Sequence, residues 1–382
     1  AADDGWIVVV ADTTYNETDL NSNGKKIYLE GVDYHSGGLT QPVIDCQQAG
    51  RAFYFGSGET SDSVVDNFTI QNGRVEDRGG GAALCENDSS PTITNCVFQN
   101  NEAADTNSSS DNEHGGAVYC LSNSNLTMVK CEFSNNDAAQ YGGAICCSSS
   151  SPTITNCTFS SNGAENGGAV GCISNSNPSI VSCAFSSNSA DYGGALHCDF
   201  SGPYLTNCLL VGNSATNDGG AIYSDNGGWC AINCTFSGNS ANNGGAVGCN
   251  NISGVTLVNS ILWSNTASSS GNEIYINDSG SSSTLKYCCV DSTGYGFGSG
   301  VPTTTIDDSE HCIHGDPQFV NAANGDYHLK NTSPCIDVGS GFYFNQYAPF
   351  GVRTDLDGKE RFADGSNNGS AAVDIGAYEY QP

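Results

Sequence analysis

The chain has 382 residues, and 41 acidic against 11 basic side chains give it a formal net charge of −30 at pH 7. This charge excludes nucleic acid and anionic membrane surfaces as expected partners, because both repel a protein with so few cations. No apolar run approaches the ~20 residues that span a bilayer, so we expect no membrane insertion. The 19 cysteines include no Cys-x-x-Cys pair, which favours an oxidising compartment over zinc binding.

Residues 1–40 are predicted to form an N-terminal strand and capping segment. The segment begins Ala1-Ala2-Asp3-Asp4 without methionine, and we expect this start to be the mature end left after a signal peptide is removed. Secretion to the extracellular space or the cell surface follows from that expectation. The apolar run that comes next is predicted to be a strand, and four of its residues are candidates for an assembly surface: Trp6, Ile7, Val8 and Val9.

Residues 41–285 carry a repeat, with core repeats over residues 79–267. Two motifs recur together seven times, and a fixed period of 20–50 residues indicates a solenoid or a propeller. The first motif is Gly-Gly-Ala before an apolar residue, beginning at Gly80, Gly115, Gly142, Gly167, Gly193, Gly219 and Gly244. The second is an apolar residue with asparagine three positions later: Phe98/Asn101, Phe133/Asn136, Phe159/Asn162, Phe185/Asn188, Leu210/Asn213, Phe236/Asn239 and Leu262/Asn265.

The period and the composition of the repeat favour a parallel β-helix. A propeller blade needs ~40 or more residues, whereas ~26 residues suit one coil of short strands and turns. The segments are rich in β-branched residues, Ser, Asn and Gly, which are poor helix formers. We therefore predict an all-β, right-handed parallel β-helix. The Phe98-to-Leu262 series should form an internal column, and the Asn136-to-Asn265 series should form a turn ladder in a left-handed backbone.

Residues 286–382 are predicted to be a β-rich C-terminal extension. The repeats resemble those of the chlamydial polymorphic outer-membrane proteins and of secreted bacterial right-handed β-helix proteins. The extension resembles the choice-of-anchor Q domain, and the resemblance implies a bacterial surface protein. The segments that carry this second resemblance are 316–320, 324–327, 333–337, 355–358 and 374–379.

The cysteines follow the repeat in two series, one after Gly-Gly-Ala and one before the aromatic residue. Both series are expected to face inward, at one end of a flat core, so disulfides within coils compete with a ladder of buried thiols. Cys230 resembles a replacement partner where Ser224 interrupts the first series. The predicted pairs are Cys85–Cys96, Cys120–Cys131, Cys147–Cys157, Cys172–Cys183, Cys198–Cys208 and Cys230–Cys234.

Two further kinds of site are candidates. Asp355 and Asp357 resemble part of a calcium loop, although the terminal bidentate glutamate of the full pattern is missing; calcium is the one cofactor we consider, and no cofactor is certain. The Asn-x-Ser/Thr sequons are weak evidence of glycosylation, because a chain this rich in Asn and Ser produces many by chance. The candidate acceptors are Asn16, Asn67, Asn125, Asn251 and Asn331.

For a β-helix, an enzyme is the first alternative to consider. A polysaccharide lyase needs a base and cations beside a uronate, and residues 115–285 offer Lys130 alone. A hydrolase needs two carboxylates about 5–10 Å apart. Four acidic residues that precede Gly-Gly are candidates, although they suit a solvated turn edge better: Asp137, Glu165, Asp191 and Asp218.

We therefore predict a non-enzymatic extracellular structural protein. The first hypothesis is a fibre subunit that associates head to tail with its own kind, because a β-helix has two open ends. The alternatives are a tethered adhesin that binds glycans or neighbouring cells, and a polysaccharide lyase or hydrolase. Aromatic residues of the extension complete the predicted assembly surface: Phe342, Tyr343, Tyr378 and Tyr380.

Overall fold

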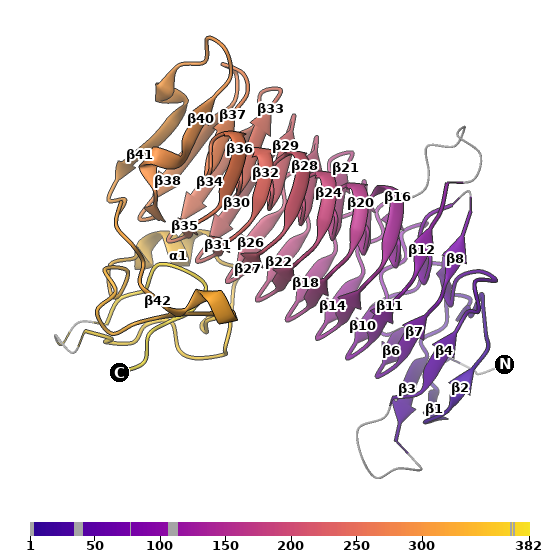
Figure 1. The fold of residues 1–382 in the computed structure, drawn as a ribbon. Coiled ribbons are helices and arrows are strands. Elements are labelled where there is room, and N and C mark those ends of the chain that lie inside the picture. The colour runs from indigo at the N-terminus through magenta and orange to yellow at the C-terminus, as the bar shows by residue number, and fades with distance from the viewer. Residues whose placement is uncertain (1–3, 34–40, 77, 106–113, 367–368, 370) are drawn as a thin grey trace.

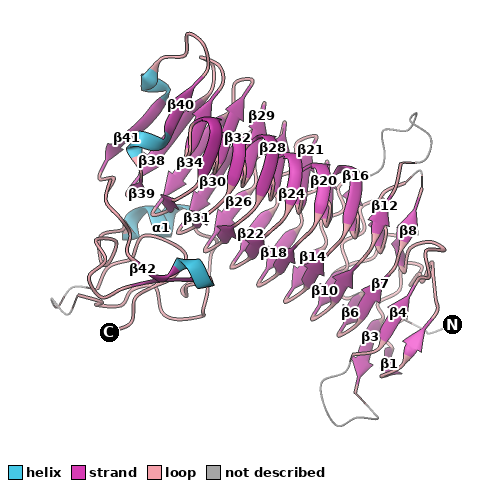
Figure 2. Cartoon of the chain, viewed as in Figure 1, coloured by secondary structure: helices cyan, strands magenta, loops and turns pink. Residues whose placement is uncertain are grey.

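The computed structural model describes residues 4–33, 41–76, 78–105, 114–366, 369 and 371–382. The chain winds into about 11 coils of roughly 26 residues, and the coils stack into an elongated rod (Figure 1). Strands make up nearly all of its regular structure, as Figure 2 shows. The predicted all-β parallel β-helix is confirmed.

Each coil contributes short strands to parallel sheets that run along the rod, which we name sheets A to D. Sheet A contains β1 (Ile7–Ala11), β3 (Tyr28–Val32), β6 (Val64–Asp66), β10 (Thr92–Thr94), β14 (Thr127–Val129), β18 (Thr153–Thr155), β22 (Ser179–Val181), β26 (Tyr204–Thr206), β30 (Gly228–Ile232), β34 (Gly254–Val258), β38 (Ser282–Lys286) and β41 (Ile306–Glu310). Sheet B contains β2 (Thr14–Tyr15), β4 (Val43–Asp45), β7 (Thr69–Gln71), β11 (Val97–Gln99), β15 (Glu132–Ser134), β19 (Thr158–Ser160), β23 (Ala184–Ser186), β27 (Leu209–Val211), β31 (Thr235–Ser237), β35 (Ile261–Trp263) and β39 (Cys289–Val290).

Two further sheets complete the wall of the rod. Sheet C contains β5 (Phe53–Phe55), β9 (Ala83–Cys85), β13 (Val118–Leu121), β17 (Ile145–Ser148), β21 (Val170–Ile173), β25 (Leu196–Asp199), β29 (Ile222–Asp225), β33 (Val247–Asn250), β37 (Ile274–Ile276) and β40 (Tyr295–Phe297). Sheet D contains β8 (Arg74–Val75), β12 (Glu102–Ala103), β16 (Asp137–Tyr141), β20 (Gly163–Asn166), β24 (Ser189–Tyr192), β28 (Ser214–Asp218), β32 (Ser240–Asn243) and β36 (Thr266–Ser270).

The interior of the rod is filled by columns of identical or similar side chains. The predicted column of seven apolar residues is confirmed, because consecutive members pair in register in sheet B and all are fully buried: Phe98, Phe133, Phe159, Phe185, Leu210, Phe236 and Leu262. The first four rings stack with centroids 4.7–4.9 Å apart. Such burial contributes about 1.5–3 kcal/mol per side chain, so the repeat itself supplies the core.

The predicted asparagine ladder is confirmed, and it runs in one direction. From Asn101 to Asn239, each side-chain Nδ2 donates to the Oδ1 of the equivalent asparagine in the next coil, over 2.8–3.0 Å, and the series ends at Asn265. The expectation of a left-handed backbone at these asparagines is corrected. The left-handed residue is the one before each of them, with φ of 54° at Asn135 and 56° at Ser161. The turn therefore aims the following asparagine inward, where it bonds along the stack.

Glu273 ends the ladder and gives it a pH dependence. Asn265 donates its side-chain Nδ2 to Glu273 Oε2 over 2.6 Å, and the carboxyl group is 2 % exposed. Burial raises the pKa of Glu273 to about 7, against the lowering effect of the bonds from Asn265. A raised folded-state pKa of a carboxyl group stabilises the fold below its ordinary pKa, and this contribution is lost as the pH rises through 7.

Glu273→Gln should therefore raise the free energy of unfolding at pH 8 by about 2–3 kcal/mol and leave it nearly unchanged at pH 4. Urea unfolding at both pH values measures the effect. Glu165→Gln is the control, because Glu165 is an exposed residue of sheet D and should show no such difference. Equal stabilisation by Glu273→Gln at both pH values would contradict the account.

The predicted division at residues 40 and 285 is not what the strands show, although residues 1–3 and 34–40 lie outside the described residues. β1 pairs in parallel with β3, and β3 pairs with β6, so the N-terminal segment forms the first coils of the same sheets. At the other end β38 pairs with β41, so the coils continue to Glu310. The alternation of apolar residues continues through both segments, and the sheets therefore continue as well.

Residues 311–382 form what we call the C-terminal module. The module lies beside the last coils, and not over their end (Figure 1). Its elements are the antiparallel pair β42 (Phe319–Asn321) and β43 (Asp326–Leu329), the 3-10 helix η3 (Ala322–Asn324) and the helix α1 (Gly341–Tyr347). Two more 3-10 helices, η1 (Ser292–Gly294) and η2 (Thr303–Thr305), belong to the last coil.

Outward-facing apolar residues of the last coils hold this module. Ile232 and Val258 of sheet A pack against Phe344 and Val373. Ile261 of sheet B packs in a second cluster that includes module residues such as Ile375. Equivalent outward positions of earlier coils are mixed: Thr155 and Val181 belong to the column of Ile232, and Thr158 and Leu209 to that of Ile261. The module packs where apolar residues follow one another in these columns, at Ile232 and Val258.

Candidate functional site

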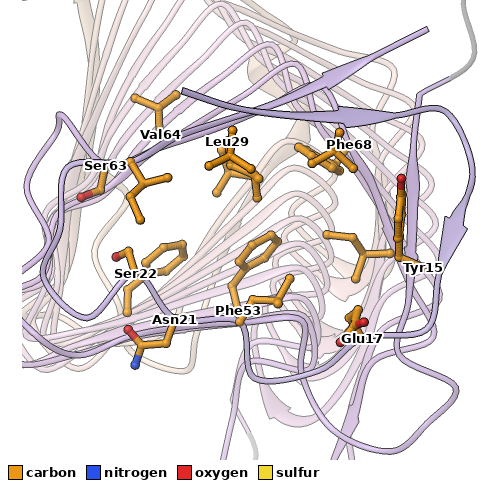
Figure 3. A pocket seen from close by; sticks show the side chains of 16 residues that line it. Tyr15, Glu17, Asn21, Ser22, Leu29, Phe53, Ser63, Val64 and Phe68 are labelled. Carbon is orange, nitrogen blue, oxygen red and sulfur yellow. The ribbon is translucent and has the colours of Figure 1, made fainter. Parts of the chain in front are cut away.

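The N-terminal end of the rod opens into a hollow, which we call the mouth. The mouth has a volume of about 440 Å³ and is lined by 16 residues (Figure 3). Its wall is mostly apolar and includes Val8, Val10, Leu29, Phe53 and Phe68. These side chains belong to the columns that fill the interior elsewhere, so the mouth is an uncovered cross-section of the core.

Polar groups surround the mouth and fix its turns. Ser22 lines the mouth and donates its hydroxyl to Glu59 Oε1 over 3.0 Å. The Glu59 carboxylate also accepts from the backbone N–H groups of Gly24 and Ser57 over 2.8 and 2.9 Å. Burial works to raise the pKa of Glu59, but these N–H donors hold it below its ordinary value. A carboxylate that accepts this many hydrogen bonds holds in place the turns that surround the mouth.

The four assembly residues predicted in the first strand divide between two surfaces. Strand alternation turns Val8 into the mouth, and it turns Ile7 and Val9 to the outer face of sheet A. Ile7 is 67 % exposed, Val9 56 % and Trp6 53 %. The first strand therefore presents Ile7 and Val9 on its outer face, and together with the exposed Trp6 just before the strand they make what we call the outer apolar strip, beside the apolar hollow.

The four assembly residues predicted in the extension are not grouped on a free end. Tyr343 donates its hydroxyl to Glu310 Oε1 over 2.7 Å, and its hydroxyl oxygen accepts from Lys286 Nζ over 3.1 Å, so this ring packs on the flank of β38 and β41. Tyr378 packs inside the module on His328, with ring centroids 4.2 Å apart. Tyr380 is half-buried. Phe342 is 72 % exposed, and it alone of the four presents a largely free ring.

The cysteines form columns along the rod, and the predicted disulfides within coils are corrected. All nineteen thiols are free, including the predicted pairs Cys85–Cys96, Cys120–Cys131, Cys147–Cys157, Cys172–Cys183, Cys198–Cys208 and Cys230–Cys234. Thiol contacts run between coils: the backbone N–H of Cys131 donates to Cys157 Sγ over 3.4 Å. Ser260 continues this column, because its hydroxyl accepts from Cys234 N over 3.1 Å. The sulfur atoms therefore act as ladder acceptors, as a serine hydroxyl does.

Asp355 and Asp357 share a loop, but their carboxylates have different partners. Asp355 accepts from the backbone N–H groups of Asp357, Lys359 and Glu379 over 2.7–3.0 Å. Asp357 accepts from His328 Nε2 over 2.8 Å. Within the described part of the chain, no group of three or more acidic, histidine or cysteine side chains is arranged to hold a metal ion. Backbone donors fix this loop, and calcium stays a prediction.

The predicted glycosylation acceptors differ in access. Asn16, Asn125, Asn251 and Asn331 are exposed. Asn67 is half-buried and donates its amide to the Gly31 carbonyl over 2.7 Å. Sugar on Asn67 would break that bond, so the exposed four are the accessible acceptors.

The four acidic residues weighed for hydrolysis do not form one column. Glu165 and Asp191 occupy equivalent places in β20 and β24, between two paired positions. Asp137 pairs with Gly163, and Asp218 pairs with Tyr192, at different levels of sheet D. The series is therefore spread over three positions of the strand.

Sequence reasoning missed most of the mouth. Val10, Leu29, Phe53 and Phe68 line it, but none was singled out, because the core motifs begin at Gly80. The alternation in Phe53-Tyr54-Phe55, where both Phe side chains are buried, is the signal that would have extended the columns to this end.

Comparison with family models supports the fold. Residues 43–210 match the family described as the right handed beta helix region, and residues 207–225 match the Chlamydia polymorphic membrane protein repeat. No curated protein matches the chain. Among solved structures, the crystal structure of pectate lyase Pel9A is similar at 12 % identity and a TM-score of 0.41, over 99 % of this chain and 97 % of that one. Among the described residues, no helix is both long and apolar enough to cross a membrane.

Proposed function

We propose that this right-handed β-helix repeat protein is a non-enzymatic extracellular structural protein that associates end to end with other copies of itself. The observation that carries the proposal is the mouth, where about 440 Å³ of the apolar interior is uncovered. Exposed apolar surface of this kind is a typical protein-interaction site. A second copy supplies a matching surface, because its last coil belongs to the same columns.

The strand edges favour a head-to-tail contact. At the mouth, sheets A and B end in β1 and β2, while β5 of sheet C is bridged by Leu20. At the far end, sheets A and C end in β41 and β40, while β39 of sheet B is bridged by Ile313. Unpaired edges of parallel strands template further pairing. Tyr295 and Phe297 of β40, together with Val301, pack on the last coil while staying partly exposed, so they can seat against the mouth. Unlike ends in contact give an open filament.

The sides of the rod oppose other associations. The net charge of −30 makes copies repel one another sideways, and it disfavours a polyuronate as substrate. An adhesin or a lyase would need a carbohydrate-binding surface on the side of the rod. End-to-end association needs no such surface, because its contacts lie at the two ends.

Val8→Asp places a charge in the wall of the mouth and should abolish association, whereas the wild-type chain should form filaments. Sedimentation and electron microscopy at high protein concentration measure this outcome. Ile252→Asp is the matched control, because Ile252 is 77 % exposed in the turn between β33 and β34, two strands before the end of sheet A, and filaments of this variant should be unchanged. A wild-type chain that stays monomeric would refute the proposal, and circular dichroism verifies that the coils of each variant are folded.

A further inference from the structure

We propose that helix α1 of one copy covers the outer apolar strip of β1 in the next copy, so that each junction is closed along the side as well as at the end. This inference rests on the end-to-end assembly proposed above and adds to it a second surface and its partner.

The argument begins with one outward-facing column of sheet A. The column starts at Val9 and continues coil by coil through Glu30, Asp66 and Thr94. It then passes through Val129, Thr155, Val181 and Thr206. It ends with Ile232, Val258, Lys286 and Glu310. Val9 of the strip and the residues under the module therefore lie at the two ends of the same column.

At the C-terminal end the chain itself covers this column. Ile232 and Val258 are 1 % and 0 % exposed under Phe344 of α1 and Val373. Tyr343 of α1 reaches both Lys286 and Glu310, so the cover extends to the last strand of sheet A. The neighbouring ring of Phe342, whose centroid lies 5.2 Å from that of Tyr343, is 72 % exposed. The part of the module that covers the column therefore ends at the Phe342 ring, most of which is not buried against other apolar residues.

At the N-terminal end the column has no cover from its own module. Val9, Ile7 and Trp6 are each more than half exposed, although they would be expected to bury apolar surface.

Continuing sheet A from one copy into the next brings these two ends together. The strand after β41 would be β1 of the next copy, about 4.8 Å further along the rod. Its Val9 would then follow Glu310 in the column that Tyr343 covers. The exposed Phe342 ring would lie within side-chain reach of the strip. The module would therefore bridge two copies by extending the contact it already makes within one.

Photo-crosslinking tests the contact in intact filaments. A benzophenone amino acid replaces Phe342, and the control variant carries it at Phe200, which is 56 % exposed midway along the rod. Filaments made from mixed light and nitrogen-15 copies show which cross-links join two chains. We expect position 342 to react with residues 6–10 of another copy and position 200 to give no such product.

Substitutions give an independent measure. Val9→Ser and Phe342→Ser should each raise the critical concentration for assembly roughly tenfold, since tenfold corresponds to about 1.4 kcal/mol of lost contact. The double variant should lose less than the product of the two effects, and Ile252→Ser should change nothing. Filaments whose cross-links from position 342 fall elsewhere would overturn this inference and leave the proposed function intact. A failure of the wild-type chain to assemble would overturn both.

Discussion

Replacing Arg361 by methionine is expected to release the C-terminal module from the rod while the coils stay folded. Arg361 is fully buried, and its Nη2 donates to Asn207 Oδ1 over 2.9 Å and to the Ala377 carbonyl over 2.7 Å. Its Nη1 lies 3.5 Å from Glu379 Oε2. Methionine has similar length but neither donors nor charge. Leaving these buried acceptors without their charged donor costs about 3–5 kcal/mol in total.

The surrounding carboxyl groups explain why this loss is large. Burial raises the pKa of Glu379 to about 8 and that of Asp374 to about 6, so both groups already resist ionisation in this place. Without the guanidinium group, the carboxyl groups of Glu379 and Asp374 must be protonated, or the module must unfold. Hydrogen exchange should show fast exchange over residues 311–382 and unchanged protection in sheets A to C.

Lys359→Met is the control for Arg361→Met. The Lys359 side chain is 45 % exposed, and its Nζ lies 3.6 Å from Asp357 Oδ2. An exposed pair of this kind is worth less than about 1 kcal/mol, so the module should stay docked. Slow exchange over residues 311–382 in Arg361→Met would refute the role given to the buried arginine.

Replacing Gly143 by alanine is expected to disrupt the coils themselves. Gly143 is the second glycine of its pair, and a Cβ atom there would press against the carbonyl oxygens of Gly163 and Gly168. Both are backbone atoms of the β-helix wall, so neither can rotate away. Overpacking against a fixed backbone should cost about 4 kcal/mol or more, and urea unfolding measures the loss.

Gly163→Ala is the matched control, because it adds the same methyl group in the neighbouring coil. A Cβ at Gly163 would lie 2.8 Å from Asp137 Oδ1, which ends a flexible side chain. The residue pairs with Ser189 in the next coil, so this position accepts a side chain. The expected change is below about 1 kcal/mol. Equal losses for the two variants would show that backbone crowding is not the cause.

The repeat made the body of the molecule predictable from sequence. Phe133 and Asn136 recur with neighbours of the same type in neighbouring coils, so periodicity alone placed each in a column. The cysteines show the limit of that reasoning. Periodicity gave Cys147 and Cys157 as members of two series, but it could not tell whether a sulfur faces across the coil or along the stack. In the second series, the Cys157 sulfur accepts from the backbone N–H of Cys131 in the neighbouring coil, so this series bonds along the stack.

The ends of the rod were harder to predict because nothing repeats there. The contact between Arg361 and Asn207 joins residues 154 positions apart, and no local pattern signals it. Glu273 likewise replaces a ladder asparagine from a different place in the coil, eight residues after Asn265. The mouth combines residues of the first coils, where the motifs had not yet begun.

The module docks on the rod through Asn207, Asn233 and Asn259. The number of coils before Asn207 can therefore be changed without changing this docking surface. Each coil upstream of Asn207 contacts mainly the coils before and after it, and those from Asn101 onward carry the same ladder residue. Excising residues 163–188 would rejoin Asn162 to Ser189, an equivalent point of the next coil. The molecule would become shorter by one strand spacing, about 4.8 Å. The rod can therefore be shortened or lengthened in fixed steps, with both of its ends kept unchanged.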